Sequence, residues 1–149
     1  MTRILLIFIL LFTFNVKAQN DSIPQTPEQQ KKAINLAVKW TTLLTEGKHV
    51  DSLMNISTVP FALDRKKFLN SNDELKSFYL EVINLKGERE LPKTTAEVYA
   101  SKYEIIEKCI PINVLIIKIE LIIDDSKSHT ILVSVEISGN EMKVIGFSD

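Results

Sequence analysis

The hydrophobic periodicity of this chain changes once, after the segment Gly87–Lys93, and that change restricts the possible folds more than any other feature. Before it, apolar residues recur at spacings of three and four, which is typical of amphipathic helices. From Ala96 onward, apolar and polar residues alternate, which is typical of strands with one buried face. Helices followed by consecutive strands predict an α+β domain with the helices on one side of an antiparallel sheet.

The first predicted helix carries start and stop signals. Thr26 is a candidate N-cap, Pro27 fits the first helical position, and Gln29 completes a capping box. Gly47 is the expected stop. One face of this helix is apolar and would pack on a sheet: Ala33, Leu36, Ala37, Trp40, Leu43 and Leu44.

A small hairpin is predicted between two further helices. A short helix covers 49–55, and a strand over 59–63 has Pro60 near its start. The polar residues 64–66 reverse the chain, and 67–69 return.

The third helix is predicted over 72–86. Ser71 and Glu74 form its capping box, and Gly87 is its expected stop. Short turns, among them Gly139–Asn140, join the strands that follow, so we expect neighbours in sequence to pair antiparallel. These strands are expected at 96–106, 113–123, 130–137 and 142–147.

The first 18 residues are typical of a secretory signal peptide. Arg3 precedes an apolar run from Ile4 to Phe14, and Ala18 ends a small-residue cleavage site. The run is shorter than the ~20 residues that span a bilayer as a helix. We therefore expect export to a periplasm or the outside of the cell, a flexible tail over 19–25 and one domain over 26–149.

Charge and cysteine content exclude several classes of function. Without residues 1–18 the chain has 16 basic and 19 acidic side chains, a net charge of −3, which predicts no binding to nucleic acid or to a membrane surface. Cys109 is the one cysteine, so no intramolecular disulfide can form despite the expected oxidising compartment. Its apolar neighbours favour a buried side chain over a reactive thiol.

The order of these elements resembles the nuclear transport factor 2-like superfamily, including its SnoaL-like members. The resemblance rests on Trp40 in the first helix and on three motifs: "VPF" at 59–61, "SNDEL" at 71–75 and "KVIGFSD" at 143–149. It implies a cystatin-like conical fold, with a pocket between the helices and the concave face of a curved sheet of about four long strands. We call this interior space the cone. The resemblance also implies frequent dimers packed through the sheets.

Five aromatic residues are the candidates for lining the cone: Trp40, Phe61, Tyr79, Tyr99 and Tyr103. Tyr99 and Tyr103 lie four residues apart on one predicted strand, so regular alternation would place both on one face. An isomerase- or dehydratase-like enzyme could use one of them as an oxyanion donor and Asp64 as a base. The sequence favours the other interpretation of each residue, a solvent-exposed turn for Asp64 and plain sheet aromatics for both tyrosines.

No metal site or cofactor is predicted. His49 and His129 have no partner indicated by spacing, and the "DDSKS" segment at 124–128 lacks the glycine and terminal glutamate of a calcium loop. The glycines stand isolated, so no phosphate-binding loop is indicated.

Three functional hypotheses follow from this pattern. The first is an exported, non-catalytic domain that binds a small apolar ligand or a protein partner in or around the cone. The second is the enzyme described above, and the third is a structural or interaction protein whose cone is filled by side chains. We also predict a homodimer, because the outer sheet face would carry Ile116, Ile122 and Leu132 among Lys118, Glu120, Ser134 and Glu136.

Overall fold

The computed structural model describes residues 25–64, 66–86, 92–106, 110–124 and 127–149. The predicted signal peptide, nearly all of the predicted tail, Gly87 and Cys109 lie outside this part of the chain. For Tyr103 and its neighbours in the strand the structure describes the backbone alone.

The first helix, α1 (Pro27–Glu46), begins and ends as its sequence predicts. The Thr26 hydroxyl accepts a hydrogen bond from the Gln29 N–H at 3.2 Å, and the Gln29 side chain accepts one from the Thr26 N–H at 2.9 Å. Gly47 ends the helix with a φ of 69°, in the left-handed region that glycine adopts without strain. The capping-box prediction is confirmed at both hydrogen bonds.

The hairpin also forms where it was predicted. The short helix α2 (Val50–Ile56) leads directly into β1 (Ser57–Leu63), and β2 (Lys67–Leu69) returns antiparallel to it. Asp64 opens the turn with a φ of 50°, and the Lys66 N–H donates to the Leu63 carbonyl at 3.0 Å. Asp tolerates this left-handed conformation better than most residues do.

The third helix, α3 (Asn72–Lys86), starts with the second predicted capping box. The Glu74 N–H donates to the Ser71 hydroxyl at 3.2 Å. The Glu74 carboxylate accepts from the N–H groups of Asn70 and Ser71, at 2.6 and 3.3 Å. These bonds use the N–H groups of Ser71 and Glu74, which a helix start would otherwise leave unpaired, and that of the preceding Asn70.

Four long strands follow, as the change of periodicity predicts: β3 (Lys93–Ile106), β4 (Ile110–Asp124), β5 (Lys127–Ser138) and β6 (Glu141–Ser148). Each pairs antiparallel with the next. The structure extends most of the predicted strands by two or more residues at their ends, where the alternation of apolar residues is already lost.

The sheet contains six strands in the order β2-β1-β6-β5-β4-β3, with β1 parallel to β6. The expected sheet of about four long strands is thus extended by the predicted hairpin, which adds β1 and β2 beyond β6. Ala62 pairs with Gly146 at this junction, and a Cβ added to Gly146 would lie 2.6 Å from the Ala62 carbonyl oxygen. The missing side chain of Gly146 therefore permits the close approach of β1.

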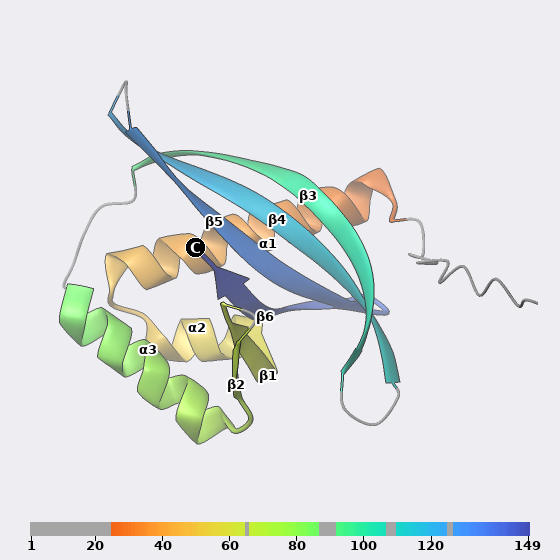
Figure 1. The fold of residues 1–149 in the computed structure, drawn as a ribbon, viewed down its shortest axis with the longest axis horizontal. Coiled ribbons are helices and arrows are strands. Elements are labelled where there is room, and N and C mark those ends of the chain that lie inside the picture. The colour runs from red at the N-terminus through yellow and green to blue at the C-terminus, as the bar shows by residue number, and fades with distance from the viewer. Residues whose placement is uncertain (1–24, 65, 87–91, 107–109, 125–126) are drawn as a thin grey trace, which may run out of the picture.

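The three helices pack on this curved, unclosed sheet, and α1 crosses it in Figure 1. The predicted fold class, an α+β cone, is confirmed. Buried residues of α1 and α3 share one core with inward-facing residues of the strands. Its largest fully buried side chains are Trp40, Tyr79, Phe61, Leu53, Leu75, Leu115, Ile117 and Ile119.

Candidate functional site

Three of the predicted pocket residues meet in the core. Trp40 comes from α1, Phe61 from β1 and Tyr79 from α3, and all three are fully buried. Their ring centroids are separated by 6.0 to 6.4 Å, the range of favourable tilted and edge-to-face aromatic contacts. The aromatic pattern in the sequence thus identified residues that do come together.

The Tyr79 hydroxyl joins these elements through two buried hydrogen bonds. It accepts one from the Trp40 indole Nε1 at 3.0 Å and shares another with the Ser57 hydroxyl at 2.7 Å. Burial raises the pKa of Tyr79 to about 12, although the bonds with Ser57 and Trp40 act in the opposite direction. At neutral pH the group is therefore a neutral phenol, a hydrogen-bonding partner and not a base.

Two further rings close this region. Phe78 and Phe147 have centroids 6.1 Å apart, and Phe147 lies 5.3 Å from the Trp40 ring. We call Trp40, Phe61, Phe78, Tyr79 and Phe147 the aromatic cluster. It occupies the space between the helices and strands β1 and β6, so this part of the interior is filled by side chains.

Tyr99 does not belong to this cluster. Its side chain is 61 % exposed, and a β-bulge interrupts the β3–β4 register between Val98 and Ala100. The bulge breaks the regular alternation on which a shared face for Tyr99 and Tyr103 depended. The backbone of Tyr103 pairs with Asn113, and its side chain lies outside the described part of the chain.

Asp64 lies at the exposed tip of the hairpin. Its N–H donates to the Phe147 carbonyl at 3.0 Å, and its Oδ1 accepts from the Asp149 N–H at 3.4 Å. Strands β6, β5 and β4 separate the hairpin from β3, which carries both tyrosines. The described residues therefore do not bring Asp64 together with a tyrosine on β3, and Asp64 has the turn role that its sequence context favoured.

Asn113 on β4 is a feature that the sequence analysis missed. Its Oδ1 is buried and accepts no hydrogen bond, and it is the only such side-chain atom among the described residues. Asn113 pairs with Ile137, which is buried in the core, so it lies on the core-facing side of the sheet. The available signal was a single amide in the otherwise aliphatic segment 112–117.

The residue as a whole is only half-buried, so Asn113 lies where the core meets solvent. Two residues further along the same face is Leu115, which is buried, and Ile137 lies opposite. A buried carbonyl oxygen without a donor costs on the order of 1–3 kcal/mol, and native proteins seldom leave one unpaired. The site combines an aliphatic wall with one unused acceptor.

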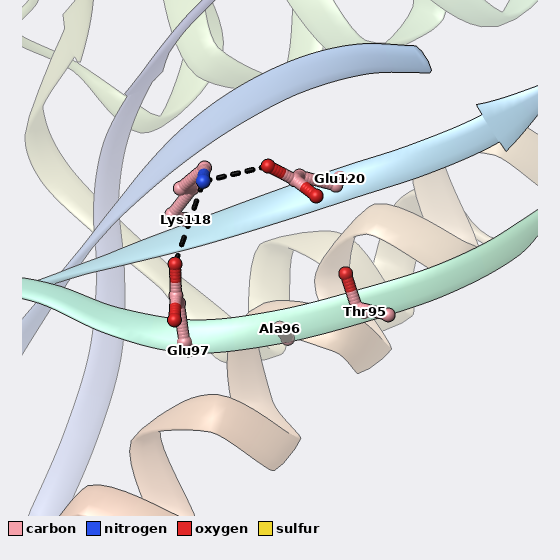
Figure 2. Close-up of a pocket in the computed structure, with 5 residues that line it drawn as sticks. All are labelled: Thr95, Ala96, Glu97, Lys118 and Glu120. Atoms are coloured by element: carbon pink, nitrogen blue, oxygen red, sulfur yellow. Dashed lines mark hydrogen bonds and ion pairs between the residues drawn. The ribbon is translucent and has the colours of Figure 1, made fainter. Parts of the chain in front are cut away.

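A small polar depression of about 180 Å³ lies on the opposite face of the sheet. Figure 2 shows Lys118 placed between Glu97 and Glu120, with Thr95 and Ala96 alongside. The Lys118 Nζ lies 2.6 Å from Glu120 and 3.4 Å from Glu97, and its hydrogen bond with Glu120 raises the pKa of Lys118. These charges satisfy one another in contact with solvent, which is typical of a surface ion-pair network.

The outer face of the sheet is less apolar than we expected. Ile116 is 2 % exposed, so it adds almost no accessible surface. Ile122 and Leu132 are half-buried. The predicted homodimer would therefore depend on these two side chains and their polar neighbours.

A groove of about 410 Å³ separates β2 from α3. Lys67, Phe68 and Leu69 form one wall, and α3 forms the other with Asp73, Glu74, Ser77, Phe78 and Glu81. Phe68 is 49 % exposed at this place. The sequence analysis identified the hairpin and the helix but not the groove between them.

The histidines lie at the surface. His49 is the N-cap of α2, and His129 Nε2 lies 3.8 Å from the Asp149 carboxylate, with both side chains exposed. Among the residues that the structure describes, no three His, Cys, Asp or Glu side chains are grouped as metal ligands would be.

None of the described helices is both long and apolar enough to cross a membrane.

Comparison with known proteins supports the fold and leaves the activity open. A domain of unknown function with a cystatin-like fold from Nostoc punctiforme aligns with a TM-score of 0.51 at 11 % identity, over 83 % of this chain and 77 % of that one. Another such protein from the same organism aligns with a TM-score of 0.52 at 10 % identity, over 85 % and 92 % of the two chains. No protein-family model matches the sequence. A search of curated proteins also finds no match.

Proposed function

We propose that this chain, which has the cystatin-like cone fold of the nuclear transport factor 2-like superfamily, is an exported, non-catalytic binding domain. Its ligand is a small, mainly apolar molecule that carries one hydrogen-bond donor. The observation that carries this proposal is the buried Oδ1 of Asn113, which has no partner among the described residues. Fold alone does not assign a function, so the proposal depends on this site.

The surroundings of Asn113 favour an apolar ligand. On the same face, Leu115, Val135 and Ile137 are buried aliphatic residues, and no described charged side chain belongs to their core. A ligand N–H or O–H that reached Oδ1 would remove the cost of the unpaired acceptor, which is on the order of 1–3 kcal/mol. Such an acceptor discriminates strongly against analogues without the donor.

Among the side chains that the structure describes, no proton-transfer pair is assembled, which favours binding over catalysis. Asp64 is exposed at the hairpin tip, and Tyr79 is a neutral phenol engaged with Trp40 and Ser57. General acid–base catalysis needs a titratable group within reach of the substrate and with a pKa near the working pH. Asp64 does not meet the first requirement, because it lies at the exposed hairpin tip, and Tyr79, with its raised pKa, does not meet the second.

Extraction of the natural ligand tests this proposal. The protein is purified from its native host, denatured in organic solvent, and the released small molecules are identified by mass spectrometry. We expect one apolar compound, close to equimolar with the wild-type protein and depleted at least about tenfold from Asn113→Leu, which corresponds to about 1.4 kcal/mol. Asn84→Leu, at an exposed position of α3, is the matched control and should retain the compound.

A second readout separates a binding defect from a folding defect. Leucine has the same number of side-chain heavy atoms and the same branching at Cγ as asparagine, and it removes the unpaired acceptor, so Asn113→Leu should raise the free energy of unfolding of the ligand-free protein by about 1 kcal/mol. A variant that is more stable yet empty supports the proposal. Equal yields of compound from wild type and Asn113→Leu would refute it.

The filled-cone hypothesis and the homodimer stay as predictions. The aromatic cluster fills the interior beside β1 and β6, as the filled-cone hypothesis expects, whereas Asn113 lies elsewhere, on β4. A protein that released no compound, and in which Asn113 was packed against protein donors, would favour the filled cone.

A further inference from the structure

The groove between β2 and α3 has the form of a peptide-binding site at the edge of a sheet. Its β2 wall consists of the consecutive residues Lys67, Phe68 and Leu69. Successive side chains of a strand point to opposite faces, so a groove lined by all three runs along the edge of the strand and not over one face. β2 is the terminal strand of the sheet, with β1 on one side alone.

An edge strand presents backbone N–H and C=O groups that a further strand can pair with. Extended peptides bind other domains in this way, with backbone hydrogen bonds to the edge and side-chain contacts to an adjacent helix. Here α3 follows β2 directly in the chain and faces it across the groove (Figure 1). Both components of such a site are therefore present.

The acidic side chains on the α3 wall of the groove favour a positively charged ligand. Asp73, Ser77 and Glu81 are spaced four residues apart, so they form one stripe on α3, and all three line the groove. Glu74 lines it as well, but its carboxylate already caps the helix. No described side chain forms an ion pair with Asp73 or Glu81, so two unpaired carboxylates face the groove, and with Glu74 they outnumber its one lining cation, Lys67.

The spacing of these carboxylates matches an extended chain. Eight residues of helix place Asp73 and Glu81 about 12 Å apart along the axis. Four residues of a strand span about 13 Å, and residues i, i+2 and i+4 point to the same face. Basic side chains at i and i+4 would reach the two carboxylates, and an apolar side chain at i+2 would face Ser77 and contact Phe78.

Phe68 provides an exposed apolar contact on the other wall. At 49 % exposure it is one of the few large hydrophobic side chains in the described part of the chain that are open to solvent. A peptide strand beside β2 would cover it with the side chains that point away from α3.

We propose that this groove binds an extended segment of a partner protein, with Lys or Arg at two positions four residues apart and an apolar residue midway. The segment adds to the sheet as a strand beside β2. This site is independent of the ligand proposed for the cone, so Asn113→Leu should leave it unchanged.

Selection from a random peptide library tests the proposal. Seven-residue peptides displayed on phage are selected against the purified protein, and the consensus is synthesised with a fluorescent label for anisotropy measurements. We expect enrichment of the basic–apolar–basic spacing and weaker binding as salt is raised from 0.05 to 0.5 M, because exposed charge pairs are screened. Backbone amide signals of 67–69 should shift on addition of the peptide in NMR spectra.

Charge reversal supplies the matched comparison. The double variant Asp73→Lys/Glu81→Lys should lose at least about tenfold in affinity, equivalent to about 1.4 kcal/mol. The double variant Asp51→Lys/Glu141→Lys changes the net charge equally at exposed positions outside the groove and should bind as the wild type does. Phe68→Ala shortens an exposed side chain and gives a second groove variant, expected to bind several-fold more weakly.

Four results would overturn the proposal: no enriched peptide, enrichment without the basic spacing, equal affinity in the charge-reversed variant, or concentration-dependent shifts at 67–69 without peptide. The last result would mean that a second copy of this chain occupies the edge of β2.

Discussion

Replacing Tyr79 by Phe tests the role assigned to the buried hydroxyl. The change removes one oxygen atom and leaves the ring and its aromatic contacts in place. It deprives the Trp40 indole N–H of its acceptor at 3.0 Å and the Ser57 hydroxyl of its partner at 2.7 Å. Both groups are buried, so water cannot replace the lost oxygen without rearrangement.

The expected cost follows from these two unpaired groups. Each buried donor or acceptor left without a partner costs on the order of 1–3 kcal/mol, and relief from burying the phenol hydroxyl offsets part of the sum. We therefore expect Tyr79→Phe to lower the free energy of unfolding by about 2–3 kcal/mol. This is a large fraction of the 5–15 kcal/mol that is typical of a domain.

Urea unfolding followed by fluorescence measures this loss. Trp40 is the only tryptophan in the chain and is itself the hydrogen-bond partner, so its emission reports on the site. With a denaturant dependence of about 1–3 kcal/mol per molar, the midpoint should fall by roughly 0.7–3 M. Tyr99→Phe, at an exposed position, is the control and should stay within about 0.5 kcal/mol of wild type. A Tyr79→Phe midpoint equal to that of the control would refute the reasoning.

Three further predictions concern pH, backbone contact and assembly. Folding raises the pKa of Tyr79 from 10.0 to about 12, so the neutral phenol stabilises the folded state fully below pH 10, and this stabilisation is lost as the pH rises to 12. Unfolding measured across this range should show the free energy of unfolding fall by about 2–3 kcal/mol in the wild type, a fall that Tyr79→Phe lacks. Gly146→Ala would bring a methyl group against the Ala62 carbonyl, so thermal unfolding should show that the free energy of unfolding falls by more than about 2 kcal/mol. Gly139→Ala is the comparison and should lower it by about 1 kcal/mol, because Gly139 has a φ of 60° but open space around it. Sedimentation at micromolar concentration should give a dimer that Leu132→Glu dissociates; a wild-type monomer would contradict the predicted assembly.

Local signals predicted the elements well because their causes lie within a few residues. The box formed by Thr26 and Gln29 starts α1, and the box formed by Ser71 and Glu74 starts α3, each through hydrogen bonds that span three residues. Gly47 ends α1 in the conformation that its type favours. The order of helices and strands then restricts the fold to a sheet with helices packed on it.

Features that depend on contacts between distant segments could not be predicted. The parallel pairing of β1 with β6 joins residues more than 80 positions apart, and no local pattern indicates it. The bulge beside Val98 is likewise a matter of register between two strands, and it interrupts the regular alternation from which a shared face for Tyr99 and Tyr103 was expected.

In the candidate site, too, some residues could be predicted from local sequence and others depend on contacts between distant segments. Periodicity identified Trp40, Phe61 and Tyr79, because large apolar side chains on the buried faces of their elements must meet in the core. Asn113 was missed because the burial of one oxygen depends on everything that packs around it. The groove was missed because its two walls become a site only when their positions in space are known.

The central claim, that the cone receives a ligand at Asn113, is tested most directly by a crystal structure of the protein purified from its native host. We predict electron density for a non-protein molecule whose nitrogen or oxygen lies within about 3.2 Å of Asn113 Oδ1, with its apolar part along Leu115 and Ile137. A protein donor or an ordered water alone at that distance would contradict the account.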